Sequence, residues 1–257
     1  MSGQRRTTVR GLIGLVIFLL LWEAVSRSHL VDTDVIPPPS SVAVQLGHLF
    51  GLQEFRADFY ATLLAWIISV LVSALIAVPL GLLLGNIPGL RVATSAIVEF
   101  LRPIPPVTLV PAVIVAFGDG AQTKIIVATF TAVWPIMFNV IYGLNEVDPQ
   151  LVDTAQVFRT RRTRIAYAVR LPLVMPYALT GIRLSAALSL IAIVSTEFLS
   201  GGVGFGSYFF DAGEASGNIT IEISGVVLAG LLGYLVNLAL VSSQTKFFAW
   251  SPESRVK

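Results

Sequence analysis

A single basic, amphipathic stretch interrupts an otherwise apolar chain: Asp153-Thr154-Ala155-Gln156-Val157-Phe158-Arg159-Thr160-Arg161-Arg162-Thr163-Arg164-Ile165-Ala166-Tyr167-Ala168-Val169-Arg170-Leu171-Pro172. Long apolar segments lie on both sides of it. Five arginines make it too polar for the hydrocarbon core of a membrane. We therefore expect it to lie across the cytoplasmic surface of a membrane protein, where it can dock on a soluble partner.

Composition places the whole chain in the membrane. Of its 257 residues 55% are hydrophobic and only 12% are charged, and the mean hydropathy is +0.81. Soluble domains carry about 25% charged residues. The absence of cysteine excludes disulfides, thiolate metal sites and cysteine nucleophiles, and two histidines do not favour a histidine-rich metal site. The net charge of +2 gives no reason to expect a nucleic-acid partner.

Six apolar runs approach the length of about 20 residues that a helix needs to cross a bilayer core of about 30 Å. They cover residues 11–26, 59–84, 92–117, 124–144, 173–199 and 221–247. The sequence therefore predicts an all-α polytopic membrane protein of about six transmembrane helices. Residues 1–257 form one membrane domain, with an amino-terminal helix in residues 1–30 and a five-helix core in residues 59–247.

The lysines and arginines that flank these runs orient the chain by the positive-inside tendency. With the amino terminus inside, twelve fall on the cytoplasmic side: Arg5, Arg6, Arg10, Arg91, Arg159, Arg161, Arg162, Arg164, Arg170, Lys246, Arg255 and Lys257. Three fall outside, namely Arg27, Arg56 and Lys124. Both termini are therefore predicted to be cytoplasmic. A secretory signal peptide cleaved near Ala24-Val25-Ser26 is an alternative for the first run alone.

Proline marks the short helices outside the spans. Pro37-Pro38-Pro39 predicts a helix that begins near Ser40 or Ser41 and lies along the outer interface. Pro149, with Asp148 as its cap, predicts a second short helix over residues 149–158. A third is expected to run from Ile165 to Leu171-Pro172, which would redirect the chain into the membrane.

The basic stretch resembles the coupling segment of ATP-binding cassette importer permeases. Their motif is Glu-Ala-Ala, three residues, Gly, and a spacer that ends in a hydrophobic residue, one further residue and Leu-Pro. Here Asp153-Thr154-Ala155 stands at the triplet, Arg159 at the glycine, Val169 at the hydrophobic position and Leu171-Pro172 at the end. The resemblance implies that residues 148–172 form the coupling segment. The residues expected to contact the ATPase are Asp153, Thr154, Ala155, Val157, Phe158, Arg159, Leu171 and Pro172.

Insertion of Ala155, Val157 and Phe158 into a groove of the partner would turn partner motion into a push on the fourth and fifth helices. The arginines would add attraction to an acidic rim. An alternative for these arginines alone is that they anchor anionic lipid headgroups and enforce topology.

A second resemblance, to the nitrate, sulfonate and taurine permease group, covers nearly the whole chain. It is carried by Leu101-Arg102-Pro103-Ile104-Pro105-Pro106-Val107-Thr108-Leu109-Val110-Pro111, Phe117-Gly118, Thr196-Glu197-Phe198-Leu199 and Gly201-Gly202-Val203-Gly204-Phe205-Gly206. It implies a permease homodimer in the bacterial plasma (inner) membrane, two ATP-binding cassette ATPase subunits and an extracytoplasmic solute-binding protein. No phosphate-binding loop of the form Gly-x-x-x-x-Gly-Lys-Ser/Thr occurs. ATP and Mg would therefore sit on the partner ATPase, and this chain is expected to be no enzyme and to bind no cofactor.

Ionisable and helix-breaking residues within the spans are candidates for the translocation path. Arg102 and Arg183 each lie about 15 Å deep, since each is 10 or 11 residues from the nearer helix end. The path candidates are Arg102, Pro105, Thr108, Asn139, Arg183 and Glu197. The alternatives are structural: Arg102 pairs with Glu99, Arg183 pairs with Ser185 or Asn139, and Glu197 is a buried, hydrogen-bonded acid.

Four prolines in residues 103–111 remove backbone donors, so the third helix is expected to kink or unwind there and to line the path. The glycine run 202–206 is expected to form an outer loop, either a plain tight turn or a gate, because no strand and helix frame it as a dinucleotide site.

The sequence thus predicts the permease subunit of an ATP-driven importer for a small solute, with a sulfonate- or nitrate-like oxyanion as the leading substrate. The same machinery importing a pyrimidine-type vitamin precursor is one alternative. A gradient-driven carrier that couples through Glu99 or Glu197 is another, although no inverted repeat supports it. An intramembrane enzyme is disfavoured because neither His29 nor His48 lies in a helix core.

Overall fold

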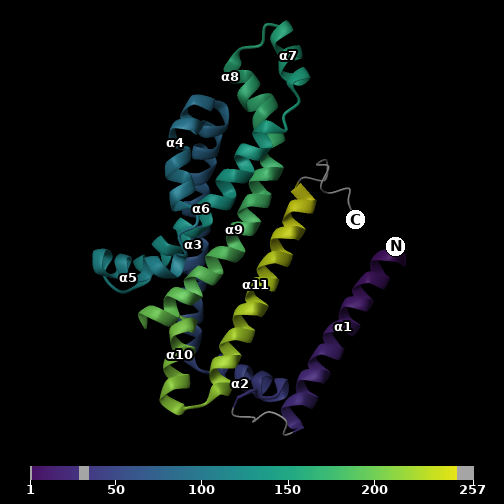
Figure 1. Cartoon of the computed structure of the whole chain (residues 1–257). Coiled ribbons are helices and arrows are strands. Elements are labelled where there is room, and N and C mark those ends of the chain that lie inside the picture. Colours follow the sequence, from purple (N-terminus) through teal and green to yellow (C-terminus); the bar gives the residue numbers. More distant parts are fainter. Residues whose placement is uncertain (1, 29–34, 248–257) are drawn as a thin grey trace.

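The structure is a computed structural model, and it describes residues 2–28 and 35–247. The described part is built from helices with no strand (Figure 1). In chain order they are α1 (Ser2–Arg27), α2 (Pro39–Gly51), α3 (Gln53–Asn86), α4 (Pro88–Leu101), α5 (Pro106–Phe117), α6 (Ala121–Asn145), α7 (Pro149–Val157), α8 (Arg162–Ile165), the π-helical turn η1 (Ala166–Arg170), α9 (Leu171–Ser200), α10 (Phe205–Ser216) and α11 (Ile219–Phe247). The all-α prediction is confirmed.

The centre of the molecule is a bundle of α3, α6 and α9, which pack along much of their length. Small residues make this close approach possible, since membrane helices associate mainly through van der Waals packing. A Cβ atom at Gly181 of α9 would lie only 2.8 Å from Ile136 Cα of α6, and one at Gly81 of α3 would lie 2.8 Å from Val140 Cβ. The backbones of the three helices are therefore held closer together than larger side chains would allow.

Five of the described helices are long and apolar enough to cross a membrane: α1, α3, α6, a helix that covers Thr163–Ser200, and α11. They contain the predicted runs 11–26, 59–84, 124–144, 173–199 and 221–247. The remaining run, 92–117, is not one straight helix. It divides into α4 and α5, which meet at an angle of 91°.

The break between α4 and α5 follows from the prolines. The amide of Arg102 still donates to Val98 O at 3.0 Å, but Pro103, Pro105 and Pro106 have no N–H to continue the helical pattern. Pro106 then starts α5 at its first turn, where the missing N–H is harmless. The prediction that the third helix breaks here is confirmed.

Helix α1 stands apart from the bundle and joins it through α2 (Figure 1). The indole N–H of Trp22 donates to Pro37 O at 3.1 Å, and Glu23 accepts hydrogen bonds from Arg27 and from Ser40. Helix α2 begins at Pro39, which confirms the predicted start near Ser40.

Helix α7 lies at one end of the molecule, and α2 and α10 lie at the other (Figure 1). The start of α1 and the end of α11 lie between these two ends, beside the bundle. That both termini are on the side of residues 148–172, and that this side is cytoplasmic, stay predictions. We call the end that carries α2 and α10 the outer end.

One expectation is wrong: Leu171-Pro172 does not redirect the chain. Residues Thr163–Ser200 run on as one helical span of 38 residues. The amide of Leu171 donates to Ala166 O, five residues back, so the helix widens into a π-turn just before Pro172. This wider turn accommodates the proline ring and its missing donor without a change of direction. The second part of the basic stretch, from Thr163, is thus an extension of α9.

Candidate functional site

Helix α7 is fixed at its start by the predicted cap. Asp148 Oδ1 accepts a hydrogen bond from the amide of Gln150 at 2.8 Å, and Pro149 occupies the first helical position. Both features satisfy or remove amide donors that a helix start leaves unpaired. The helix predicted over residues 149–158 is confirmed, ending at Val157.

Arg159, which stands where the motif has glycine, forms the turn at the end of α7. Arg159 has φ of +52° and is the one non-glycine residue with positive φ in the described ranges 2–28 and 35–247. Its amide donates to Gln156 O at 2.8 Å, and the amide of Thr160 donates to Ala155 O at 3.1 Å. These two bonds are those of a Schellman motif, which glycine usually closes because it has no Cβ. The spacing of the coupling motif therefore keeps its turn although the glycine is gone.

Arg159→Gly is expected to stabilise this turn by about 0.5–1 kcal/mol, because a left-handed conformation costs an L-residue about 1–2 kcal/mol and the added freedom of glycine when unfolded offsets part of the gain. Amide hydrogen exchange of residues 149–160 should slow roughly threefold. Arg161→Gly is the matched control, since Arg161 has no positive φ. Equal protection in the two variants would contradict this account of Arg159.

Three large apolar side chains in residues 148–160 are exposed. Val157 is 80% exposed, Phe158 is 79% exposed and Leu151 is 48% exposed. Ala155, which was expected on the same face, is half-buried, whereas Asp153 and Thr154 are exposed. Leu151 was missed by the sequence analysis, although its position near the start of the predicted helix makes it a candidate. We call Leu151, Val157 and Phe158 the apolar tip. Helix α7, which carries Leu151 and Val157, lies beyond the end of the bundle (Figure 1).

The base of the segment is tied to α3. Arg170 Nη1 donates to Asn86 Oδ1 at 2.5 Å, and the Asn86 amide nitrogen donates to Leu82 O at 2.7 Å. Asn86 is the last residue of α3, immediately before α4. Arg170 therefore links the start of the α9 span to the end of α3.

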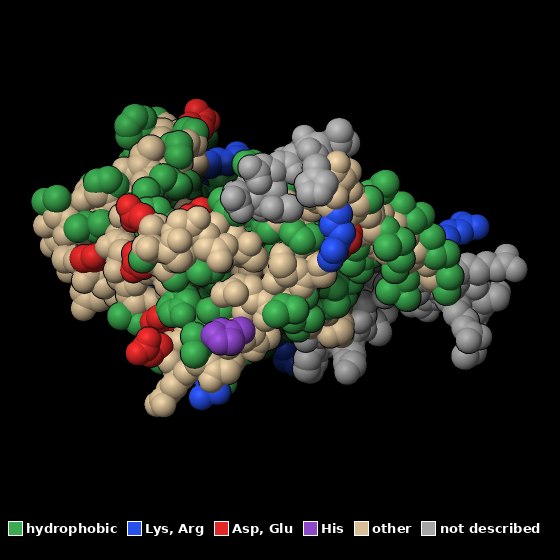
Figure 2. Space-filling model, turned by 90° about the horizontal axis from the view of Figure 1, so that it is seen from below, with side chains coloured by type: hydrophobic (Ala, Val, Ile, Leu, Met, Phe, Trp, Pro, Cys, Tyr) green, Lys and Arg blue, Asp and Glu red, His purple; other side chains and the backbone are tan. Residues whose placement is uncertain are grey.

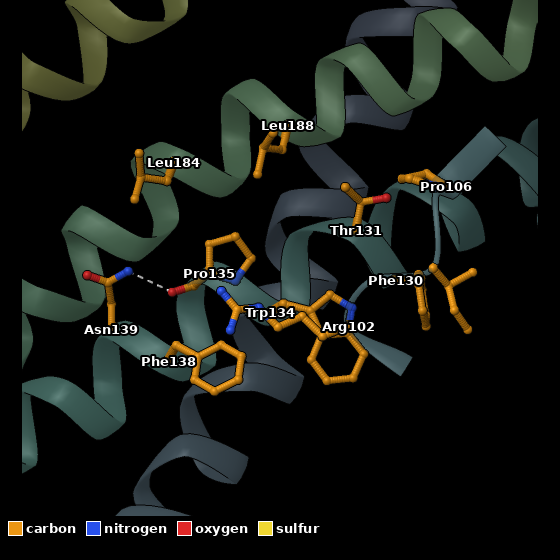
Figure 3. A pocket seen from close by; sticks show the side chains of 11 residues that line it. Arg102, Pro106, Phe130, Thr131, Trp134, Pro135, Phe138, Asn139, Leu184 and Leu188 are labelled. Atoms are coloured by element: carbon orange, nitrogen blue, oxygen red, sulfur yellow. Dashed lines mark hydrogen bonds between the residues drawn. The ribbon is translucent and has the colours of Figure 1, made fainter. Parts of the chain in front are cut away.

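A cavity of about 410 Å³ lies at the break between α4 and α5, against α6 and α9 (Figure 3). Its lining residues are Arg102, Ile104, Pro106, Phe130, Thr131, Trp134, Pro135, Phe138, Asn139, Leu184 and Leu188. Two of the predicted path residues, Arg102 and Asn139, are therefore brought together. The guanidinium carbon of Arg102 lies 4.7 Å from the centroid of the Phe138 ring. Asn139 donates to Pro135 O at 2.8 Å.

The alternative pairing of Arg102 with Glu99 is not formed. Among the residues that the structure describes, Arg102 takes part in no ion pair and no side-chain hydrogen bond. Arg102 and Glu99 do line the same smaller cavity of about 210 Å³ beside the first one. Arg102 is therefore available to a mobile anion.

The other path candidates lie elsewhere. Pro105 and Thr108 are exposed at the start of α5, where Thr108 Oγ1 donates to Pro105 O at 2.7 Å. Arg183 is half-buried on α9, and Leu184 beside it lines the cavity. Ser185 donates to Ala132 O at 2.5 Å. Glu197 is at the far end of α9 and belongs to a different site.

That site is a cluster of buried polar groups near the outer end, which we call the outer polar cluster: Thr62, Lys124, Glu197 and the loop 201–206. Glu197 is 1% exposed and Lys124 is 3% exposed, and Lys124 Nζ lies 2.6 Å from Glu197 Oε1. Thr62 Oγ1 donates to the same carboxylate at 2.8 Å. This arrangement is the structural alternative given for Glu197, a buried and hydrogen-bonded acid.

The backbone of the glycine run 202–206 also forms hydrogen bonds within the outer polar cluster. The amide of Gly206 donates to Glu197 Oε2 at 3.0 Å, and Lys124 Nζ donates to Val203 O at 2.5 Å. A Cβ atom at Gly204 would lie 2.1 Å from Glu197 Oε1, so only glycine fits. The loop thus uses glycine for close approach to a carboxylate.

Lys124 is a second residue whose role the sequence did not reveal. It was placed among the three cations flanking the spans on the outside, yet it is buried and joins α6 to α9. An acid inside an apolar run needs a partner, and this rule could have pointed from Glu197 to the one lysine near the same end.

Figure 2 views the molecule from the outer end. Acidic side chains gather over one part of this surface, with few basic ones beside them. The residues that α3 and α10 contribute near this end include Glu54, Asp58, Asp211 and Glu214. This surface does not attract free anions from solution.

Comparisons with known proteins agree with this architecture. The family model described as "Binding-protein-dependent transport system inner membrane component" matches residues 77–249, more than half of the chain. The nitrate import permease protein NrtB of Leptolyngbya laminosa is 34% identical over 160 residues, which are 62% of this chain and 57% of that protein.

Two further relatives align over most of both chains. The taurine transport system permease protein TauC of Escherichia coli K12 is 25% identical over 244 residues, 93% of this chain and 88% of TauC. The bicarbonate transport system permease protein CmpB of Synechocystis is 29% identical over 247 residues, 91% of this chain and 86% of CmpB.

Among solved structures, a chain of the MetNI methionine ABC transporter in an inward-facing conformation superimposes with a TM-score of 0.63 at 24% identity, covering 73% of this chain and 93% of that one. This likeness concerns the fold. The family match shows that the chain belongs to the inner membrane components of binding-protein-dependent transport systems, the permease family.

Proposed function

We propose that the chain is the membrane subunit of an ATP-driven importer, in which residues 148–172 dock on a separate ATPase. The observation that carries this proposal is the apolar tip of Leu151, Val157 and Phe158, which is exposed beyond the bundle. A groove on a soluble partner can bind exposed apolar side chains that a short helix presents. ATP and Mg belong to that partner.

The continuity of Thr163–Ser200 supports a mechanical role for this contact. A helix of 38 residues at 1.5 Å per residue is about 57 Å long, so a displacement at its start reaches its outer end without a joint. Its outer end holds Glu197, which is bonded to α3 and α6 through Thr62 and Lys124. Closure of the ATPases would therefore tilt α9 and act on the outer polar cluster. In an assembly of two permease copies, this tilt would open and close the path between them.

We propose a small oxyanion as the solute. The relatives named above are permeases for nitrate, taurine and bicarbonate. Arg102 supplies a cation at the α4–α5 break that no described side chain neutralises. The acidic outer end would repel a free anion, which favours delivery by a solute-binding protein. A pyrimidine-type solute makes no use of the Arg102 charge.

The proposal is tested in proteoliposomes that contain the purified complex of this chain with its co-expressed ATPase and the solute-binding protein. Uptake of radiolabelled taurine and of nitrate should require ATP on the ATPase side and the binding protein outside. Ionophores that collapse proton and sodium gradients should leave it unchanged. Uptake that survives without ATP and stops with an ionophore would establish a gradient-driven carrier instead.

A further inference from the structure

Helix α4, which ends at the cavity beside Arg102, is loosely packed. The structure describes all of α4 and none of its side chains is fully buried, whereas α6 and α9 each bury ten or more. Leu90 and Val98 are its partly buried contacts with the core. The cavity of about 210 Å³ separates much of α4 from α6. Because few buried contacts mean low local stability, α4 is displaced at little cost.

The start of α4 is fixed by its junction with α3. Helix α3 ends at Asn86, and α4 begins at Pro88, so Ile87 alone joins the two helices. The amide of Ile87 still donates to Leu83 O at 3.1 Å, in continuation of α3. We call residues 86–88 the α3–α4 corner. No loop lies in this corner to absorb a movement, so a displacement of Asn86 moves the start of α4.

The corner is bonded to the end of the basic stretch. The side-chain nitrogen of Asn86 donates to Leu82 O at 2.7 Å, and its Oδ1 accepts from Arg170 Nη1 at 2.5 Å. Arg170 is half-buried and is the last residue of the π-turn that precedes α9. Single π-turns inside α-helices are frequent at functional sites. The guanidinium also lies at the C-terminal end of α3, where the helix dipole favours a cation.

This hydrogen bond joins two parts that respond differently to a docked ATPase. Arg170 belongs to the span that the ATPase would tilt, whereas Asn86 belongs to α3. Helix α3 is packed tightly on α6 at this end, since a Cβ atom at Gly85 would lie 2.5 Å from Leu144 Cδ1. A hydrogen bond is lost beyond about 3.5 Å. A shift of the start of α9 by more than about 1 Å therefore either moves the corner or breaks the bond.

The strength of one such bond is sufficient for this purpose. A hydrogen bond with one charged partner, formed in one arrangement and lost in another, shifts the equilibrium between them about tenfold to a hundredfold. Known couplings between distant sites of a protein have about the same size. The position of a loosely packed helix such as α4 can therefore depend on this single contact.

We propose that Arg170 is a positioning residue through which the coupling segment sets the position of α4, by its hydrogen bond to Asn86. At its other end α4 leads to Arg102 and the cavity at the α4–α5 break. The bond thus gives the coupling segment a second route to this cavity, in addition to α9 itself. This inference rests on the proposed function, because the ATPase supplies the displacement.

The bond itself is tested on the detergent-solubilised full-length chain, without any ATPase. Asn86→Ala and Arg170→Met should each speed amide hydrogen exchange of residues 86–92 about tenfold. Asn86→Asp keeps an acceptor for Arg170 but loses the donor to Leu82 O, and should stay within about twofold of the unchanged chain. Asn145→Ala, at the exposed last residue of α6, is the matched control and should have no effect.

Unchanged exchange in both Asn86→Ala and Arg170→Met would overturn the proposal, whatever the ATPase does. Exchange as fast in Asn86→Asp as in Asn86→Ala would assign the effect to the contact with Leu82 O, and would overturn it as well.

The role in coupling is tested on the purified complex with the co-expressed ATPase. The chain has no cysteine, so Ser95→Cys places the sole thiol of the permease on an exposed side chain of α4 that lines the smaller cavity. Labelling by N-ethylmaleimide is followed on the permease band, without nucleotide and with ATP plus vanadate. The nucleotide should change the labelling rate about fivefold or more, and less than about twofold after Asn86→Ala or Arg170→Met is added. Added Asn86→Asp should keep the response.

A second reporter shows whether the ATPase still acts on α9. Thr163→Cys, on an exposed side chain at the start of the span, should respond to nucleotide with and without Asn86→Ala. A response at Ser95→Cys that survives both Asn86→Ala and Arg170→Met, or is absent with the bond intact, would overturn the role of Arg170. Loss of response at both reporters would overturn it too, because the bond would then act on docking. A chain that recruits no ATPase contradicts the proposed function and this role with it, and hydrogen exchange still decides whether the bond exists.

Discussion

Lys124→Met is expected to destabilise the folded protein by about 3–5 kcal/mol, the usual cost of removing one partner from a buried ion pair. The substitution keeps the length of the side chain but leaves the carboxylate of Glu197 at 1% exposure without its cation, and Val203 O without its donor. Glu197→Gln is expected to act in the same direction, because it leaves the Lys124 ammonium buried and unpaired. The melting temperature in detergent should fall by roughly 10 °C in each variant.

A double variant measures how strongly Lys124 and Glu197 stabilise each other, apart from their contacts with other groups. Lys124→Met with Glu197→Gln removes both charges, and a Gln side-chain oxygen at the position of Oε2 can still accept from Thr62 and Gly206. The double variant should therefore be less destabilised than the sum of the singles, by about 1–3 kcal/mol. Glu54→Gln, an exposed acid near the same end, is the control and should be neutral. Additive losses in the double variant would show that Lys124 and Glu197 do not act as a pair.

Phe158→Asp is expected to abolish co-purification of the ATPase while the chain still inserts and folds. Phe158 is 79% exposed and its ring makes no contribution to the core of the isolated chain, so a charge there costs little folding free energy. In a docked complex the same ring would fill a groove, where loss of an aromatic anchor costs about 2–4 kcal/mol and a buried, unpaired carboxylate adds to this.

Val203→Asp is the matched control for this variant. Val203 is 66% exposed at the opposite end of the molecule, and the same type of substitution is made on an uncovered apolar side chain. The ATPase should remain bound to Val203→Asp and be lost from Phe158→Asp, as measured by the amount of ATPase recovered per permease after affinity purification. Full recovery of the ATPase with Phe158→Asp would show that Phe158 does not take part in the contact with the ATPase.

The fold could be predicted where one physical cause acts within a short segment. Apolar runs long enough to cross a bilayer located α1, α3, α6, α9 and α11, and the prolines at 103–106 located the break between α4 and α5. Asp148 and Pro149 located the start of α7. These features are set by hydropathy, missing amide donors and helix caps, all of which are local.

The errors arose where distant or compensating contacts decide. Pro172 was expected to turn the chain, but a π-turn at Ala166–Arg170 absorbs it, and proline alone does not show which of the two occurs. Lys124 was treated as a flanking charge because its partner, Glu197, is 73 residues away in the sequence. The pairing becomes visible only when α6 and α9 are packed side by side.

The candidate site was predicted only in part, because its lining comes from residues that are distant in the sequence. Arg102 and Asn139 were named from depth and residue type, and they do line one cavity.

We propose that this chain takes its energy from a separate ATPase bound at residues 148–172. It is tested most directly by affinity purification of the tagged chain from its native membranes in mild detergent, followed by identification and quantification of the proteins that accompany it. We predict an ATP-binding cassette ATPase in a one-to-one ratio with the permease. A chain that purifies alone, and transports its solute in liposomes on an ion gradient, would contradict the account.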